Sequence, residues 1–197
     1  MSAPTYASYL HLDELLSLQR PFSPPDDVDL HDAERLFIVV HQASEVLLGQ
    51  ALTDLRRIAG PGGAESAGHR ADRATWVVHT LVGNVGLLRE ALRPRDFLGF
   101  RDLFGSASGL QSTQFQELFR LTDRFAAAGL PDRARAERLR AAVVAWREAH
   151  LELVRHTIGD HPGSGDTSGI DFLRRRLTAS ARGKAVAAPG CPVGANH

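Results

Sequence analysis

Apolar residues recur every three or four positions over most of the chain, and the alternating pattern typical of strands is nearly absent. This periodicity predicts helices over about 6–18, 29–58, 71–92, 112–128, 132–158 and 170–181, with a shorter helix opened by Pro94. Two of these helices are long and the others are shorter. The pattern therefore predicts an all-α fold, a helical bundle with two long helices.

The helix ends are marked by residues that favour them. Asp29 is predicted to cap the start of the first long helix, and Asp132, after Pro131, the start of the second. Gly129 is predicted to stop the helix before Pro131, and glycine-rich stretches at 60–68, 105–109 and 159–169 read as loops. We expect a single helical domain over residues 1–181 and a disordered tail over 182–197.

Composition narrows the class of protein. The 197 residues contain 23 Lys plus Arg and 23 Asp plus Glu, so no net field favours nucleic acid or an anionic membrane. No uninterrupted apolar run reaches the roughly 18 residues of a membrane span, and the N-terminus does not resemble a signal peptide. A single cysteine, Cys191, forms neither an internal disulfide nor a cysteine-based zinc cluster. We expect a cytoplasmic protein that binds neither nucleic acid nor membrane.

Nine histidines invite a search for metal or proton-transfer chemistry, and two of them lie on the long helices. His41 interrupts a strongly apolar stretch and shares a helix face with Phe37, four residues earlier. From these residues alone, His41 could be a core histidine bonded to a backbone carbonyl, or an acid/base or hydrogen-bonding group on a pocket wall.

His150 follows Trp146 by four residues and is flanked by apolar neighbours. No cysteine, histidine or carboxylate at a convincing spacing accompanies it, so a zinc site is disfavoured. A lone histidine does suit an axial haem ligand, because the porphyrin supplies four of the iron's ligands.

Arg101 follows Phe97 and Phe100 on the short helix. Its guanidinium has the geometry to bind a carboxylate in a pocket, or it could form only a surface ion pair.

The loop Gly163-Ser-Gly-Asp-Thr-Ser-Gly169 could close over a ligand. It lacks the lysine of a Walker loop, so nucleotide binding is disfavoured. Ser106 and Ser108 lack the setting of a nucleophile elbow, which disfavours a serine hydrolase.

Four blocks together resemble the tryptophan 2,3-dioxygenase family. They are Tyr6-Ala-Ser-Tyr9-Leu-His-Leu-Asp-Glu-Leu-Leu16; Leu36-Phe-Ile-Val-Val-His-Gln42 with Glu45; Phe97-Leu-Gly-Phe-Arg-Asp-Leu-Phe-Gly-Ser-Ala-Ser-Gly-Leu-Gln-Ser112 with Gln114 and Phe115; and Gly163 to Gly169 with Asp171-Phe-Leu-Arg174. They stand in the family's order and span most of the chain. The resemblance implies a haem pocket between the two long helices, with haem b as cofactor.

The resemblance also implies roles for individual residues. His150, fourteen positions before Ser164, looks like the proximal haem ligand, and His41 like the distal histidine that hydrogen-bonds the indole nitrogen. Arg101, helped by Ser164, looks like the residue that binds the substrate carboxylate. Positions that resemble those of the haem or substrate pocket are Phe37, Phe100, Phe104 and Ser108. Tyr6 and Tyr9 resemble tyrosines that reach a neighbouring subunit's site, which implies a homo-oligomer, a dimer or a tetramer.

The chain also departs from the family pattern. Ser164 stands where the family has threonine, Asp166-Thr167 replaces a glycine-serine pair, Phe104 replaces a leucine and Leu110 a phenylalanine. A short turn at Gly129-Leu-Pro-Asp132 takes the place of a long helical insertion, and the tail that of a C-terminal extension.

The resemblance predicts a haem-dependent enzyme that adds O2 across the indole C2–C3 bond of tryptophan or a related indole. Two alternatives stay open at this stage. One is a peroxide-dependent haem hydroxylase of a tyrosine-like aromatic substrate. The other is a non-catalytic haem- or indole-binding protein.

Overall fold

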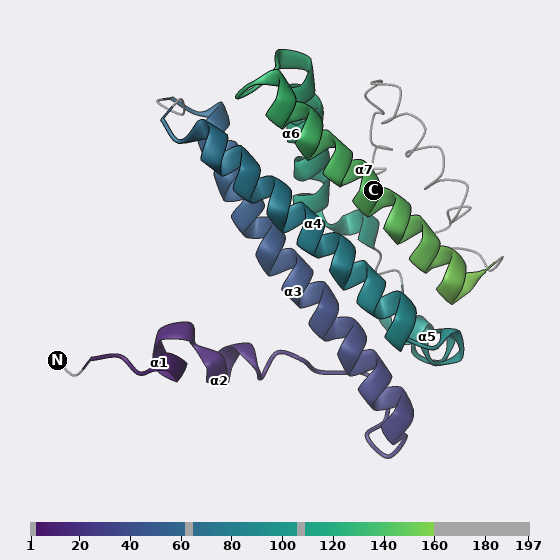
Figure 1. The fold of residues 1–197 in the computed structure, drawn as a ribbon. Helices are drawn as coiled ribbons and strands as arrows, with labels where there is room; N and C mark the ends of the chain where they lie inside the picture. The colour runs from purple at the N-terminus through teal and green to yellow at the C-terminus, as the bar shows by residue number, and fades with distance from the viewer. Residues whose placement is uncertain (1–2, 62–64, 106–108, 160–197) are drawn as a thin grey trace, which may run out of the picture.

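The computed structural model describes residues 3–61, 65–105 and 109–159, and within them it contains helices and no strands (Figure 1). Three long helices form the body: α3 (Val28–Ala59), α4 (Ala67–Ala91) and α7 (Arg133–Ile158). Shorter helices complete it at the two ends: α5 (Pro94–Phe100), η1 (Arg101–Phe104), η2 (Gly109–Gln111) and α6 (Thr113–Ala128). The all-α prediction is confirmed.

The long helices run side by side with α4 in the middle (Figure 1). Both α3 and α7 pack on α4, α6 contacts α3 and α7, and α5 contacts the same two helices. Helix α4 thus separates the two outer helices, and α5 and α6 each contact both of them. Side chains of α3 and α7 therefore meet in the same hydrophobic clusters.

Capping residues explain most of the helix ends. Ser112 accepts a hydrogen bond from the Phe115 amide at the start of α6, and Asp132 does the same for the Arg135 amide at the start of α7. Gly129 ends α6 in the left-handed conformation, with φ of 63°, which a glycine adopts without strain. These ends lie where the sequence predicted them.

Three predicted boundaries were wrong in detail. The first long helix begins at Val28, because the Asp27 side chain rather than Asp29 caps it by accepting from the Leu30 amide. The helix predicted to start at about Ala71, α4, begins at Ala67. The N-terminal helix is two pieces, α1 (Tyr6–Leu10) and α2 (Leu12–Leu15), because His11 between them has a left-handed backbone with φ of 51°.

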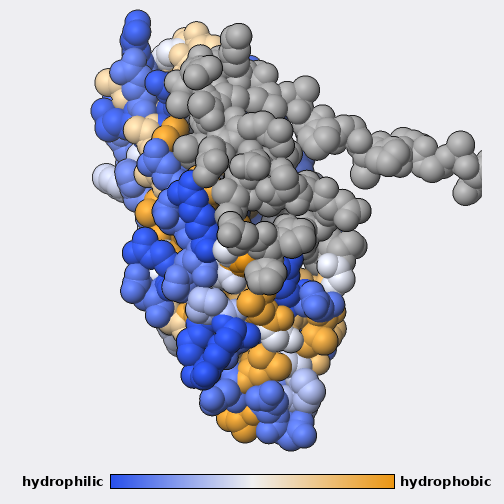
Figure 2. All heavy atoms as spheres, turned by 90° about the vertical axis from the view of Figure 1, so that its right-hand side faces the viewer, coloured by the Kyte–Doolittle hydropathy of each residue, from blue (hydrophilic) through white to orange (hydrophobic). Residues whose placement is uncertain are grey.

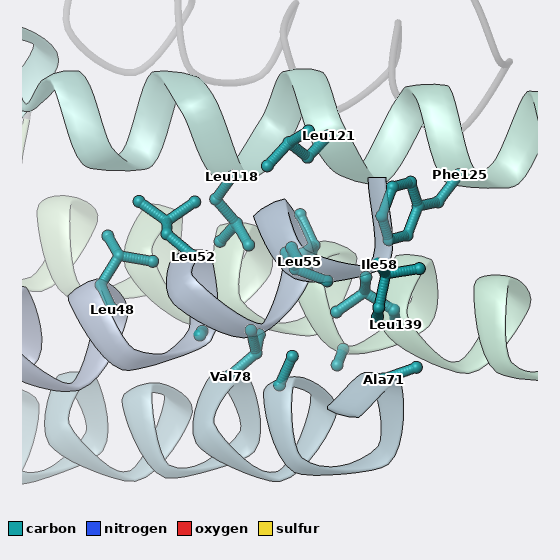
Figure 3. Packing of buried hydrophobic residues seen from close by; sticks show 14 of the residues in the cluster. Leu48, Leu52, Leu55, Ile58, Ala71, Val78, Leu118, Leu121, Phe125 and Leu139 are labelled. Carbon is teal, nitrogen blue, oxygen red and sulfur yellow. The ribbon is translucent and has the colours of Figure 1, made fainter. Parts of the chain in front are cut away.

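The core at one end of the body is aliphatic (Figure 3). Leu48, Leu52 and Leu55 from α3 point toward Leu118 from α6 and Leu139 from α7, and all five are buried. Each such side chain stabilises the fold by about 2 kcal/mol through the apolar surface it removes from water. This core fixes the spacing of the long helices and so positions their other halves.

Helix α3 is long enough and apolar enough to cross a membrane by length and composition alone. A core helix passes the same test, and α3 contributes residues to both hydrophobic cores of the body. It also buries two carboxylates, Glu34 and Asp54, each of which accepts hydrogen bonds from the protein. These features are typical of a core helix.

The N-terminal arm, residues 3–18 with α1 and α2, extends away from the body (Figure 1). It is tied to α3 near its root, where the Gln42 side chain donates to the Leu18 carbonyl at 3.1 Å and accepts from Gln19 at 2.7 Å. Just beyond, the buried Glu34 carboxylate accepts from the Phe22 and Ser23 amides. These bonds fix where the arm leaves the body.

Candidate functional site

A second cluster of side chains joins α3, α4, α5 and α7 at the other end of the body. Its buried members are Val40, Val85, Leu88, Leu92, Phe100 and Leu153. Aromatic residues from α3, α5, η1 and α7 pack against them. Figure 2 shows hydrophobic residues gathering among hydrophilic ones at the end of the bundle where α5 lies. Three of the candidate residues, Phe37, Phe100 and Phe104, belong to this second cluster.

Phe37 stands at the centre of the aromatic group. Its ring stacks parallel to that of Phe104 at 5.7 Å and lies 5.6 Å from that of Phe100, between ring centroids. Phe97 completes the group at 5.7 Å from Phe37. Phe100 is fully buried, whereas Phe37 and Phe104 are half-buried. The aromatic side chains predicted as pocket residues are therefore packed together around one turn of α3.

His41 lies against the same group. Its ring centroid is 4.0 Å from that of Phe37, and its Nδ1 is 2.8 Å from the Phe37 carbonyl oxygen. A carbonyl only accepts hydrogen bonds, so Nδ1 carries the proton and donates it. In the neutral ring Nε2 is then an acceptor with a free lone pair. The bond from Nδ1 to a backbone carbonyl is the one that a core histidine would make, but the residue is exposed and lies outside the buried core. Its role on a pocket wall stays a prediction.

The pKa of His41 is lowered from its usual 6.5. Desolvation by the surrounding protein is the largest cause, and it outweighs the Phe37 carbonyl and the nearby Glu45 carboxylate, which both raise it. The ring is not excluded from water, so the shift reflects the protein around it rather than full burial. His41 is accordingly neutral at pH 7.

His150 on α7 lies near enough to His41 for a charge on the His41 ring to lower the pKa of His150. Burial is the larger cause, and together the two bring that pKa to about 4. The His150 ring stacks on Trp146 at 5.1 Å with 7° between the planes. Among the residues described, neither of its ring nitrogens makes a hydrogen bond. A neutral imidazole with free nitrogens has the chemistry of an axial haem ligand.

Arg101 begins η1 immediately after the buried Phe100 and is half-buried. Its placement beside the aromatic group is compatible with the predicted role of binding a carboxylate. Ser108 and Ser164 lie outside the described residues, as do the glycine-rich loop and the tail. Residues 3–61, 65–105 and 109–159 contain no group of three or more His, Cys, Asp or Glu side chains placed to hold a metal ion.

The structure brings His41, His150 and the phenylalanines together, but it does not bring Tyr6 or Tyr9 to them. Both tyrosines lie on the N-terminal arm, 77% and 73% exposed, and the arm points away from the body (Figure 1).

Two features of the site were not predicted from the sequence. Trp146 stacks on Phe115 of α6 at 4.3 Å as well as on His150, and Gln114 donates to the Glu45 side chain at 2.7 Å, which joins α6 to α3. The spacing of four residues between Trp146 and His150 signals their contact. The partners on α6 depend on how the helices pack, and no local pattern reveals them.

The fold and site together define an all-helical protein with two neutral histidines from different long helices, close together beside an aromatic group. Comparison with known proteins identifies the family. The family model described as tryptophan 2,3-dioxygenase matches residues 1–127. The chain belongs to the tryptophan 2,3-dioxygenase family, whose members are haem-dependent oxidoreductases.

Individual relatives extend the match beyond residue 127. The chain is similar to the tryptophan 2,3-dioxygenase of Anaeromyxobacter dehalogenans, with 30% identity covering 89% of this chain and 91% of the relative. It is similar to that of Nocardioides sp. at 28% identity over 88% and 89% of the two chains. It is 42% identical to that of Caulobacter vibrioides over 58% of this chain and 42% of the relative.

The alignment with the Anaeromyxobacter relative runs over 251 positions, more than the 197 residues of this chain, so the relative has segments that this chain lacks. The family match ends within α6, at residue 127. It therefore includes His41, Phe37, Phe100, Arg101 and Phe104 and excludes His150.

Proposed function

We propose that this chain is a haem-dependent dioxygenase that adds O2 across the indole C2–C3 bond of tryptophan or a closely related indole. The observation that carries the proposal is the state of His41. Its Nδ1 is committed to the Phe37 carbonyl and its ring is neutral, so Nε2 presents a lone pair. An indole N–H is a donor only and needs such an acceptor.

His150 would hold haem b through the iron. The fit rests on its neutral ring, its free nitrogens among the described residues and the apolar side chains around it. Haem, when bound there, would supply the dioxygen chemistry that the side chains of this chain lack. The chain's own part is to bind and orient the substrate and to limit the access of water.

Three groups would orient the substrate. His41 accepts the indole N–H, and Phe37 and Phe104 pack beside the indole ring. Arg101, with Ser164 from a segment outside the described residues, binds the carboxylate. Fixing the two ends of the substrate independently sets which indole bond faces the cofactor.

The proposal includes a cytoplasmic homo-oligomer, a dimer or a tetramer, in which the arm's Tyr6 and Tyr9 reach a neighbouring site. Exposed apolar side chains along the arm support it: Tyr6, Tyr9, Leu10, Leu15, Leu16 and Leu18. The relatives reported above are all named as dioxygenases, and no observation favours the peroxide-dependent hydroxylase or the non-catalytic binder.

The test is an absorption spectrum of the purified protein followed by product analysis. We expect a haem spectrum, and conversion of tryptophan to an N-formylkynurenine-type product with ferrous haem and O2. 1-Methyltryptophan lacks the N–H and should bind more weakly. A protein that takes up no haem, or that turns over only with peroxide and ferric haem, would contradict the proposal.

A further inference from the structure

Trp146 stacks on two other rings, which come from different helices. The Phe115 ring of α6 lies at 4.3 Å with 21° between the planes. The His150 ring, one turn further along α7, lies at 5.1 Å with 7° between the planes. The imidazole thus stacks on an indole that itself stacks on a third ring. We call Phe115, Trp146 and His150 the proximal stack.

The stack covers a face of the His150 ring and leaves its edges free. Both nitrogens lie on an edge, so either can bind a partner while the indole remains in contact. A histidine that binds a metal usually donates its other N–H to a carboxylate or carbonyl, and that bond fixes the plane of the ring. His150 makes no hydrogen bond with the described residues. His41, in contrast, is fixed through the Phe37 carbonyl.

Without such a bond, rotation about the last side-chain torsion of His150 is restricted mainly by packing, since that torsion has broad energy wells. The flat face of Trp146 is the contact that selects one ring orientation. Rotating the imidazole out of the parallel arrangement would lose the stacking energy and bring its edge against the indole.

Trp146 has a further aromatic neighbour that lies at an angle to it, outside the proximal stack. Phe119 lies 5.9 Å away, and the Arg147 guanidinium sits 3.9 Å above the Phe119 ring. Phe115 is fixed at the start of α6, where its amide donates to Ser112. The stack is therefore anchored in the helix that also bonds to α3.

We infer that Trp146 is a positioning residue that sets the plane of the His150 imidazole by stacking, where a hydrogen bond would usually do so. The inference rests on the proposed function, because it concerns His150 as the haem ligand. An aromatic contact of this kind changes an equilibrium about two- to tenfold. The stack should hence slow the loss of haem and narrow the range of iron–histidine geometries.

The experiment compares Trp146→Leu with Trp146→Phe and with the control Phe119→Leu. The control removes the Phe119 ring, which lies at 44° to Trp146 and outside the proximal stack. Among the described residues, this ring forms no aromatic pair with His150. Each haem-loaded variant is measured by resonance Raman for the ferrous iron–histidine stretching band, by haem dissociation and by thermal unfolding. Wild type and His150→Ala are measured alongside to assign the band.

We expect Trp146→Leu to shift or broaden the band and to speed haem dissociation about two- to tenfold. Trp146→Phe should restore both measurements most of the way, because it keeps an aromatic face. Phe119→Leu should lower the melting temperature while leaving the band and the dissociation rate as in wild type.

Two results would overturn the inference, and they are distinct. If Trp146→Leu behaves as Phe119→Leu does, with lower stability and an unchanged band, then Trp146 only fills space and the proposed function stands. If the Trp146→Leu chain does not fold, the same comparison is made with Trp146→Phe and Trp146→Tyr, which differ in the area of the stack. If the wild-type band survives in His150→Ala, both the inference and the ligand assignment fail.

Discussion

His41 and His150 have the same side chain, and their surroundings give them different chemistry. The Phe37 carbonyl fixes the tautomer of His41 and orients its ring, so that Nε2 is an acceptor. His150 has an aromatic face in place of a carbonyl and keeps both nitrogens free of hydrogen bonds to the described residues. Under the proposed function, the His41 ring accepts a hydrogen bond from the substrate and the His150 ring binds the haem iron.

The lowered pKa of His41 makes substrate binding dependent on pH in a defined direction. Because the pKa lies below 6.5, the ring is neutral from pH 8 to 6.5 and accepts the indole N–H throughout. Protonation at lower pH turns both nitrogens into donors and removes the acceptor. We expect tryptophan affinity to be constant above pH 6.5 and to fall below it, about fivefold for one hydrogen bond.

Spectral titration of the haem-loaded protein with tryptophan measures this dependence. 1-Methyltryptophan, which has no indole N–H to donate, is the matched ligand and should show little fall. A step in tryptophan affinity centred at or above pH 6.5, or an equal step for both ligands, would contradict the assignment of His41.

Arg101 offers a second prediction at this scale. Arg101→Ala should raise KM for tryptophan by tenfold or more, since a charged hydrogen bond contributes about 1.5–3 kcal/mol. It should change KM much less for indole analogues without a carboxylate. Arg95→Ala is the control: Arg95 lies on the adjacent α5, is 73% exposed and is paired with Asp96. Equal losses for both kinds of substrate would show that Arg101 supports the fold instead.

At the scale of the helix, the α3–α4 interface depends on a buried carboxylate. Asp54 is 1% exposed and accepts from the Arg73 guanidinium at 2.8 Å and from Gln50 at 3.3 Å. Burial alone would raise its pKa, but these hydrogen bonds outweigh burial and the pKa ends below 3.8. A carboxyl whose folded pKa is depressed contributes stability at neutral pH that is lost in acid.

Asp54→Asn should therefore lower the free energy of unfolding by about 1–3 kcal/mol at pH 7, because the amide cannot replace the charged hydrogen bonds to Arg73. Urea denaturation measures the difference. Glu137→Gln is the control, since Glu137 pairs with Arg133 on the exposed face of α7 and should change stability by less than about 0.5 kcal/mol. The difference between the two variants should shrink as the pH falls below 3.8 and through the lowered pKa of Asp54.

The helices were largely predictable because each is specified by local sequence. Apolar spacing located α3, α4 and α7, and the caps Ser112 and Asp132 fixed the starts of α6 and α7. The arm was mispredicted as one helix because the left-handed backbone at His11 has no signal in the hydrophobic pattern. Contacts between helices, such as Gln114 with Glu45, depend on packing and were not predictable.

The candidate site was likewise predictable in its residues but not in the contacts between them. Resemblance to a family selected His41 and His150, which the pattern alone left undecided between core and ligand roles. The sequence did not show that the Phe37 carbonyl fixes the tautomer of His41, because a backbone bond is not visible in residue types. It also gave no reason to join Trp146 to Phe115, which lies on a different helix.

At the scale of the whole molecule, the proposed homo-oligomer accounts for the exposed N-terminal arm. It presents Tyr6, Tyr9 and several leucines to solvent, and apolar surface of this kind favours association. Its root is fixed to α3 through Gln42 and Glu34, so the arm leaves the body in a defined direction. We expect removal of residues 1–18 to convert the oligomer to a monomer. Light scattering would show this as a fall in particle mass much larger than the mass of the residues removed.

Mixing two inactive variants tests whether arms are exchanged between copies. One variant carries Tyr6→Ala and Tyr9→Ala, and the other carries His41→Ala. If each arm completes a neighbour's site, a mixed dimer contains one site built from an intact arm and an intact body. Random mixing should then restore about a quarter of wild-type activity. If each arm serves its own body, every site keeps one defect, and the mixture stays as inactive as its components.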